Sequence, residues 1–517
     1  MLSPVTKLAA KLCRESVRLG GWCSTAPALG ALALGLASCS GSESEPIPPK
    51  HVVLVTVDTL SATRMSSFGH SRATTDLAGV AASATGRSES RRSLDQLASE
   101  GVMFARAFAP RGMTFPSMAT YFTGRPPLEH GAIDNGNLLC EAVPTMAESF
   151  QRAGFETAAF TANPLLAVGS GIERGFDKFE SYRTPERDLS VVQSATAWLL
   201  ERDLESGAPV FLWLHLMGPH MPYDPGPLEG VDYRALFTNP SFNGRANGSR
   251  EFLDKAYEDA LELDPRAIEH VRALYDGEVA RVDHLIALFV EILSGAIPEQ
   301  PVDMLEDSLF IFASDHGEEL HTRNHYWAHS KSLYDPVLHV PLFIRHPNSA
   351  PGERVMGELV ELQDLMPTVL EWFSLPLPNG MRGRSLVPLL RGEEFESRPV
   401  VAVWKDRIFS IRTDEWRYVW NPDLIEPTDP PAGAYPIPLR ALYDAQGDRN
   451  QVYDVLSSNP EVGADLERQL VEWLDALRPI CTADGVISEE RMQILDDLGY
   501  SGAREIEEPL PKGEEDE

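Results

Sequence analysis

The stretch TFPSMATYFTGRPPLEHG, Thr114 to Gly131, places a reactive side chain where a helix is expected to begin. Thr114 stands two residues before Pro116, and an apolar segment then leads into the turn-forming sequences TGR and HG. These are the signals of a helix that starts at Thr114 and is followed by a dense run of turn-forming and small residues. The hydroxyl of Thr114 is therefore a candidate nucleophile, provided that the rest of the fold supplies a metal site beside it.

Buried strands alternate with helices on both sides of this stretch. Strands are expected at residues 51–60, 102–104, 156–161, 210–215 and 309–313, and helices at residues 94–98, 141–153, 188–205 and 268–293. The strands are continuous apolar runs, as in parallel strands that are covered on both faces. The pattern predicts an α/β fold with a doubly wound, mostly parallel central sheet flanked by helices.

Polar residues follow the ends of several of these strands. Asp58 ends the first strand, His220 comes just after the strand at residues 210–215, and Asp315 and His316 follow the strand at residues 309–313. Open α/β sheets bind ligands at the carboxyl ends of their strands. Two carboxylates and an imidazole suit a divalent cation, with calcium, magnesium and manganese preferring the oxygen ligands and zinc accepting the histidine. An N-cap is the alternative role for Asp58.

The pattern changes beyond about Pro376. Short alternating strands are expected at residues 400–403, 408–412, 416–420 and 442–444, with a helix at residues 462–477. They predict a smaller C-terminal α+β domain with an antiparallel sheet. The predicted organisation is a signal peptide at residues 1–38, a tether at 39–50, a catalytic domain at 51–380 with an insertion at 71–92, the C-terminal subdomain at 381–480 and an acidic tail at 481–517.

The N-terminal segment is typical of an export signal. Lys7, Lys11, Arg14 and Arg18 precede a short apolar run, which ends in the sequence LASC at residues 36–39. Small residues directly before a cysteine resemble a bacterial lipobox, so Cys39 is predicted to carry a lipid at the start of the mature chain. Ordinary signal cleavage or an uncleaved anchor are the alternatives. We expect an exported cell-envelope lipoprotein that meets the membrane through its lipid anchor only.

The chain is strongly acidic. It carries 45 basic and 77 acidic residues, a net charge of −32. Cleavage after Ser38 would remove four basic residues and one acid and leave a net charge of −35. Such a surface repels nucleic acid and anionic lipid headgroups, which excludes a nucleic-acid partner. An anionic substrate would need locally concentrated positive charge, for which a metal is the most economical source.

Cys140 and Cys481 are the cysteines that remain beyond Cys39. The chain contains no CxxC motif. In an oxidising compartment the two thiols could form one disulfide, and two separate buried thiols are an equal alternative.

Several motifs resemble those of the sulfatase family, within the alkaline phosphatase superfamily. They occur in the family's order from about residue 51 to about residue 455: VDTL, TFPSMATYFTGRPPLEHG, GIERGFDKF, FLWLHLMGPHMPY, FIFASDHGEEL, WAHSKSLYDPVLHVPLFIRHP, GRSLVPLL and LYDAQGDRNQVYDV. The resemblance implies one divalent metal, usually calcium, a covalent ester intermediate and a small C-terminal domain with a four-stranded antiparallel sheet.

The resemblance also implies roles for individual residues. Asp58, Asp315 and His316 correspond to metal ligands, and Thr114 stands at the position of the nucleophile, which also contacts the metal. Lys331 corresponds to a lysine that holds a substrate oxyanion, and His220 to a histidine that holds an oxyanion or protonates the leaving group, with His329 beside them. Apart from the resemblance, Asn163 is a further candidate donor to the substrate. A loop histidine and a surface lysine are the alternatives for His220 and Lys331. Thr59 replaces a second acid that family members often have, so the metal would have one carboxylate fewer.

The nucleophile departs from the sulfatase pattern. Sulfatases carry Cys or Ser in a C/S-x-P-x-R motif and convert it to formylglycine, whereas this chain has Thr114 and places Met118 where the arginine would stand. The Lys and His of a GKWHLG-like segment are also replaced, by TANPLL with Asn163. A threonine before Phe-Pro resembles the nucleotide pyrophosphatase/phosphodiesterases, in which threonine attacks phosphorus directly. Their second metal site needs an Asp four residues before a His, and Leu216 stands four residues before His220.

These observations predict a metal-dependent hydrolase that uses Thr114 to attack a phosphate mono- or diester of a small molecule, glycan or lipid. A threonine ester cannot collapse by the elimination that a formylglycine hydrate allows, which favours phosphorus over sulfur. The alternatives are a sulfuric ester hydrolase resembling arylsulfatases, an envelope phosphotransferase, and a metal- or glycan-binding protein without turnover.

Overall fold

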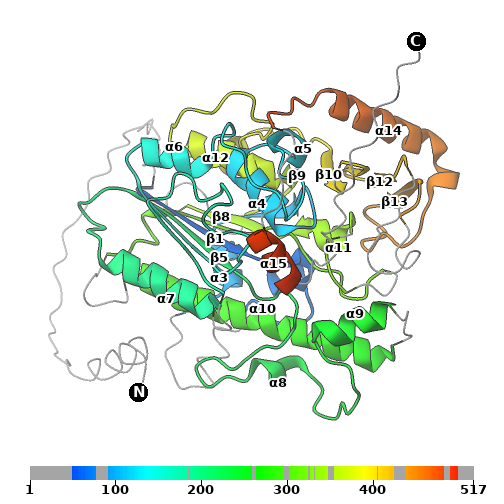
Figure 1. Ribbon diagram of the computed structural model, residues 1–517, viewed down its shortest axis with the longest axis horizontal. Coiled ribbons are helices and arrows are strands. Elements are labelled where there is room, and N and C mark those ends of the chain that lie inside the picture. Colours follow the sequence, from blue (N-terminus) through cyan, green and yellow to red (C-terminus); the bar gives the residue numbers. More distant parts are fainter. Residues whose placement is uncertain are drawn as a thin grey trace, which may run out of the picture. The chain divides into compact units, whose positions relative to one another are not determined.

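A mixed sheet of nine strands forms the centre of the described chain (Figure 1). The strand order is β4-β3-β5-β1-β6-β8-β2-β7, and β9 pairs with β2. The computed structural model describes residues 49–76, 91–183, 187–258, 263–295, 302–323, 327–330, 332–346, 354–404, 406–423, 437–481 and 489–498. Predictions for residues 1–48, for residues 77–90 of the insertion, for Lys331 and for residues 499–517 lie outside these ranges.

Most pairs of neighbouring strands in this sheet are parallel. The strands are β1 (His51–Val57), β2 (Val102–Phe108), β3 (Glu156–Thr161), β4 (Lys178–Ser181), β5 (Val210–Leu216), β6 (Ser308–Ser314), β7 (His339–Val340), β8 (Leu342–Arg345) and β9 (Arg354–Glu361). β1 lies between β5 and β6 and runs parallel to both, with Val57 opposite Leu216 and Ser314. The strands β7 and β8 run antiparallel to their neighbours. The predicted doubly wound, mostly parallel sheet is confirmed.

Helices cover both faces of the sheet. The α-helices are α3 (Leu94–Ser99), α4 (Thr114–Thr123), α5 (Pro127–His130), α6 (Met146–Arg152), α7 (Arg187–Leu200), α8 (Tyr233–Phe237), α9 (Arg250–Glu258), α10 (Pro265–Leu293), α11 (Asp335–Leu338), α12 (Leu365–Trp372), α13 (Val387–Arg391), α14 (Pro460–Asp475) and α15 (Glu489–Asp497). Alternate residues of a strand point to opposite faces. Val52 and Leu54 of β1 accordingly join a core with α4, α6 and α12, while Val53 and Val55 join a second core with α3, α7 and α10.

Two helices are shorter than the sequence pattern indicates. The segment from Glu141 is not helical before Met146, because Thr145 caps α6 in a capping box with Glu148. Such a box satisfies the free N–H groups of the first turn and so sets where a helix starts. The helix predicted at residues 188–205 ends at Leu200.

A separate four-stranded antiparallel sheet follows, as predicted. It has the order β10 (Val400–Trp404), β11 (Ile408–Arg412), β12 (Trp416–Trp420) and β13 (Arg440–Asp444). Val401 and Val403 of β10 pack with α14, whereas Val400 and Ala402 join the core of the main sheet. The second sheet is therefore joined to the first by a continuous apolar core.

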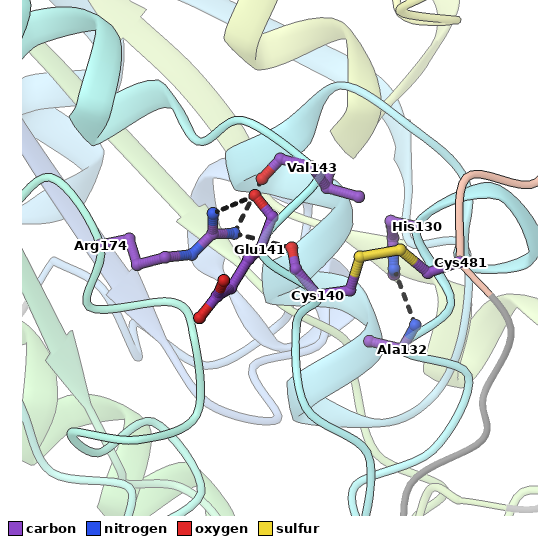
Figure 2. Close-up of a disulfide and its surroundings, with 7 residues drawn as sticks. All are labelled: His130, Ala132, Cys140, Glu141, Val143, Arg174 and Cys481. Carbon is purple, nitrogen blue, oxygen red and sulfur yellow. Dashed lines mark hydrogen bonds between the residues drawn. A yellow bond between two sulfur atoms is a disulfide. The ribbon is translucent and has the colours of Figure 1, made fainter.

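The structure pairs Cys140 with Cys481 in a disulfide, across 341 residues of sequence (Figure 2). Beside it, Arg174 donates to the carbonyl oxygens of Cys140, Glu141 and Val143. The disulfide is the first of the two alternatives that the sequence left open for these thiols.

A helix, α15, lies within residues 481–517, the range that the sequence pattern assigns to an acidic tail. Its Arg491 is buried, donates to the carbonyl oxygens of Asn135 and Gly136 and lies over the ring of Phe115 at 4.7 Å. Part of this range is thus folded, since Ile494 and Leu495 give α15 an apolar face against the core. No helix among the described residues is apolar over enough length to cross a membrane.

Candidate active site

Asp58, Asp315 and His316 meet at the carboxyl edge of the main sheet. Asp58 follows β1 and Asp315 follows β6, and the parallel register of these two strands places their ends side by side. All three residues are fully buried, and one potential ligand atom from each lies within 4.8 Å of the others. The sheet therefore brings together residues that are more than 250 positions apart in the sequence.

The loop after β1 is shaped to hold this arrangement. Thr59 has a left-handed backbone, with φ 55°, and its carbonyl oxygen accepts a hydrogen bond of 2.6 Å from Tyr275 of α10. Its N–H donates to Asp315 Oδ1 at 3.1 Å. The residue that replaces the expected second acid thus contributes its backbone N–H, which orients the Asp315 carboxylate.

One side-chain atom each of Asp58, Asp315 and His316 is without a hydrogen-bond partner among the described residues, and these three atoms fit a divalent cation. His316 Nδ1 donates to the carbonyl oxygen of Gly317 at 3.0 Å, which leaves the lone pair on Nε2. Within the described residues, His316 Nε2, Asp58 Oδ1 and Asp315 Oδ2 are buried and have no hydrogen-bond partner. Buried polar atoms without partners are costly, and a cation bound by two carboxylates and a neutral imidazole would satisfy all three.

The electrostatics of the two carboxylates agree with this fit. Burial, together with the negative charge of Asp58, raises the pKa of the Asp315 carboxyl well above its usual range. Burial lowers the pKa of His316 to about 3, so its imidazole is neutral, as a ligand must be. Two adjacent buried carboxylates without a counter-charge repel one another. A cation between them would remove that repulsion.

Thr114 begins α4, as expected. It is buried, and its hydroxyl points to Asp58 Oδ2 at 3.4 Å. A residue outside α4 stabilises its first turn, because the N–H of Phe115 donates to Asn135 Oδ1 at 2.9 Å. Gly124 ends the helix in a left-handed conformation, with φ 63°. Met118, at the position of the family's arginine, is fully buried in the apolar core.

Asn163 contacts Asp58. Its side-chain amide donates to Asp58 Oδ2 at 2.6 Å, and its Oδ1 accepts from the N–H of Leu165 at 2.9 Å. The residue expected to donate to the substrate is thus, in this geometry, an orienting group for a candidate metal ligand.

His215 is a part of the site that the sequence analysis missed. From its position on β5, its Nε2 lies 3.3 Å from Asp58 Oδ2 and its Nδ1 lies 2.9 Å from the hydroxyl of Thr56. Thr56 also accepts a hydrogen bond from Trp213 at 2.9 Å. A histidine inside an apolar strand resembles any core histidine, so the available signal was its location one residue before a strand end.

Three further residues form a second group beside the candidate ligands. The ring of His329 lies 4.5 Å from that of His316 and 5.2 Å from that of His220. His329 Nδ1 is 2.9 Å from Glu318 Oε1, and His220 Nδ1 donates to the carbonyl oxygen of Met221 at 2.7 Å. Burial lowers the pKa of both histidines to about 4 and raises that of Glu318 to about 8. Glu318 stands in the SDHGEEL motif, but its partnership with His329 was not predicted.

The structure therefore unites Asp58, Thr114, Asn163, His220, Asp315, His316 and His329 around one edge of the sheet. Lys331, the remaining predicted site residue, lies outside the described residues.

Sequence comparison decides the family of this chain. The family model described as Sulfatase matches residues 50–375. The chain belongs to the sulfatase family. This match contains each candidate ligand and Thr114.

One curated relative in the comparison is distantly similar. Arylsulfatase K of Homo sapiens is 26% identical over 328 residues, which cover 56% of this chain and 55% of that protein. The chain thus spans about half the length of this curated relative.

Two solved structures share the fold. The phosphonate monoester hydrolase of Agrobacterium radiobacter has a TM-score of 0.62 and 22% identity, and the match covers 83% of this chain and 95% of that one. An enzyme solved with its substrate D-glucosamine-2-N,6-O-disulfate has a TM-score of 0.63 and 17% identity, covering 83% of this chain and 98% of that one. The sulfatase fold thus extends to structures named for phosphonate and for sulfate esters.

Proposed function

We propose that this sulfatase-family chain is a metal-dependent hydrolase in which Thr114 attacks a phosphate mono- or diester. The observation that carries the proposal is the position of the Thr114 hydroxyl, buried at the start of α4 and 3.4 Å from Asp58 Oδ2. The hydroxyl therefore lies beside Asp58, one of the three residues that fit a cation, and this position supports the assignment of Thr114 as the nucleophile. Asp58, Asp315 and His316 would hold that cation.

A bound divalent cation would lower the pKa of a neighbouring hydroxyl and offset negative charge on the substrate. The chain's own groups supply the rest of the chemistry. Thr114 Oγ1 would form a bond to phosphorus while the bond from phosphorus to the leaving oxygen breaks, and the hydroxyl proton would pass from Oγ1 through a histidine of the site to the leaving oxygen. Water then attacks the same phosphorus, and Thr114 leaves with its hydroxyl restored.

His220 and His329 are the proposed proton carriers to the leaving oxygen. Burial keeps both rings neutral, so each ring would first accept the proton that Thr114 releases and then pass it to that oxygen. Each histidine has Nδ1 engaged, His220 with the carbonyl oxygen of Met221 and His329 with Glu318, so Nε2 is the atom that would face the reaction. The Glu318 carboxyl would orient the His329 ring, as the third member of a catalytic triad orients its histidine. Asn163 and His215 would hold the Asp58 carboxylate in place.

Phosphorus is favoured over sulfur by the chemistry of threonine. The methyl group on its β-carbon excludes simple conversion to formylglycine, and a threonine ester lacks the hydrate from which elimination could occur. Burial of Met118 in the core supports the same choice, since the arginine that accompanies formylglycine is not replaced by another cation at that position.

A sulfate ester is the second candidate substrate. It is supported by the arylsulfatase name of a relative and by the sulfated sugar bound to a structure of the same fold. We further propose calcium as the ion, on the two carboxylates of the site, and export as a lipoprotein modified at Cys39.

The test uses purified protein that lacks residues 1–39, with calcium and with p-nitrophenyl phosphate, bis(p-nitrophenyl) phosphate and p-nitrophenyl sulfate. Thr114→Ala is expected to lower kcat for the phosphate esters by at least about 10³-fold, because a nucleophile has no substitute. Thr114→Ser, which keeps the hydroxyl, should retain most of the activity.

Each remaining result has a distinct meaning. Sulfate turnover that survives Thr114→Ala would contradict the nucleophile, and turnover of the sulfate alone in the wild-type protein would select the second candidate. Equal melting temperatures of the variants would show that they fold alike.

A further inference from the structure

The helix that begins at Thr114 is capped by a distant residue. Met113, at the N-cap of α4, forms no capping side-chain hydrogen bond within the described residues. The first N–H groups of a helix have no partner inside the helix and need one from elsewhere. For Phe115 that partner is Asn135 Oδ1, at 2.9 Å, from a loop at residues 131–140 that we call the capping loop. Asn135 is fully buried, so the start of α4 depends on where this loop lies.

The C-terminal part of the chain is attached to both ends of the capping loop. At one end, the N–H of Ile480 donates to the carbonyl oxygen of Glu129 at 2.9 Å. The carbonyl oxygen of Cys481 approaches so closely that a Cβ on Gly131 would lie 2.8 Å from it. At the other end, the disulfide links Cys481 to Cys140 (Figure 2). The segment that precedes α15 in the sequence is therefore covalently bound to the capping loop.

Arg491 of α15 contacts the middle of the capping loop. Its buried guanidinium donates from Nη2 to the carbonyl oxygen of Asn135 at 2.8 Å and from Nε to that of Gly136 at 3.0 Å. The same guanidinium lies over the ring of Phe115 at 4.7 Å, as in a cation–π contact. Arg491 thus contacts both the residue whose N–H is capped and the residue that caps it.

We propose that Arg491 is a positioning residue for Thr114, which acts by holding Asn135 at the first turn of α4. The inference rests on the proposed function, because it takes Thr114 as the nucleophile. The Thr114 hydroxyl lies 3.4 Å from Asp58 Oδ2, and its direction follows from the orientation of that first turn. A nucleophile must be closely aligned with the bond that it attacks, so a small displacement lowers the rate of the chemical step. The C-terminal helix α15 is therefore a part of the active-site architecture.

The experiment measures kcat and KM of the full chain, with calcium and with whichever of the three p-nitrophenyl esters the wild-type protein hydrolyses. Arg491→Gln is expected to lower kcat about tenfold or more while KM stays within about twofold of the wild type, because alignment is lost and substrate binding is not. Arg491→Lys keeps the charge and hydrogen-bond donors and should retain part of kcat.

Arg478→Gln is the matched control and should keep the wild-type kcat. Arg478 is an exposed arginine of the same C-terminal part, and its side chain donates to the carbonyl oxygens of Asp475 and Leu477 rather than to the capping loop. The substitution changes the net charge by the same amount as Arg491→Gln.

A double variant separates positioning through Asn135 from a general loss of structure. Asn135→Ala removes the acceptor for the Phe115 N–H, so adding Arg491→Gln to it should lower kcat little further. Independent effects on structure would instead multiply. Hydrogen exchange of the first turn of α4, measured by mass spectrometry, should become faster in Arg491→Gln and stay unchanged in Arg478→Gln.

Four results would overturn the inference: an unchanged kcat in Arg491→Gln, an equal loss in Arg478→Gln, multiplied losses in the double variant, or unchanged hydrogen exchange at α4. If Arg491→Gln does not fold, Arg491→Lys and Asn135→Ala carry the same comparison. Hydrolysis by the wild type with an unchanged kcat in the Arg491 variants would overturn this inference alone. No hydrolysis by the wild type would overturn the proposed function and this inference together.

Discussion

Two buried aspartates, Asp315 and Asp335, carry the same chemical group but differ in their partners and in the direction of their pKa shifts. Asp335 accepts hydrogen bonds from Arg417 at 2.6 and 3.0 Å and from Arg412 at 3.3 Å, where the second sheet meets the main one. Burial by itself would raise the pKa of Asp335, but the charges of Arg417 and Arg412 lower it to about 2. Asp315 has backbone N–H donors on one oxygen, and its other oxygen has no hydrogen-bond partner within the described residues.

The contrast separates a structural charge from a functional one. The Asp335 cluster is complete without any ligand, so it contributes to the joint between the two sheets. Asp315 lies beside a second carboxylate, and burial raises its pKa with help from the Asp58 charge. Sites with such uncompensated groups are common where a protein binds an ion or performs chemistry. Burial alone therefore does not distinguish the two roles. The number and charge of the hydrogen-bond and ion-pair partners of each carboxylate do.

The largest effect is expected from Asp335→Asn. Loss of the carboxylate would leave Arg417, which is only 1% exposed, without its counter-charge. Removing one partner of a buried ion pair costs about 3–5 kcal/mol in the free energy of unfolding. Urea denaturation measures the change. Glu472→Gln, which breaks an exposed pair with Arg468, is the control and should have little effect. Similar losses of stability in both variants would contradict a special structural role for the buried Asp335 carboxylate.

A smaller effect is expected when calcium is added. At about 100 times its dissociation constant, a ligand that binds only the folded state raises the free energy of unfolding by about 2.7 kcal/mol. Thermal denaturation with calcium and with a chelator should show this gain in the wild-type protein and its loss in Asp315→Asn. In the chelator, Asp315→Asn should be no less stable than the wild type, since a repelling charge has been removed. Calcium stabilisation that persists in the variant would contradict the assignment of Asp315 as a ligand.

The smallest effect concerns pH. The pKa of Asp335 is about 2 in the folded protein, against about 3.9 in an unfolded chain. The unfolded state therefore binds the proton first, so this stabilising contribution is present above about pH 4 and is lost as the pH falls towards 2. The loss is about 2 kcal/mol. Denaturation between pH 5 and pH 2 should show the stability gap between wild type and Asp335→Asn narrowing; a constant gap would argue against a lowered pKa.

The candidate ligands could be predicted because each carries a local signal. Asp58 and Asp315 directly follow apolar runs that are long enough for buried strands, and the fold class implies that such strand ends meet. Their orienting partners carry no comparable signal. His215 sits inside an apolar strand, and its contact with Asp58 follows from the register that sets Thr56 opposite it. Glu318 is recognisable as a partner only when His329, 11 residues later, folds back onto it.

The sequence by itself determined the alternation of strands and helices, the location of Thr114 at a helix start and the polar residues at strand ends. These features depend on periodicity, on turn residues and on short-range capping, all of which act within a few neighbouring positions. The tertiary structure decided which side chains meet, including the Asp58–Asp315 pair, the Cys140–Cys481 disulfide and the ring contacts of His329 with His316 and His220. Such contacts depend on strand order, register and packing between segments that are distant in sequence, and no local pattern encodes them.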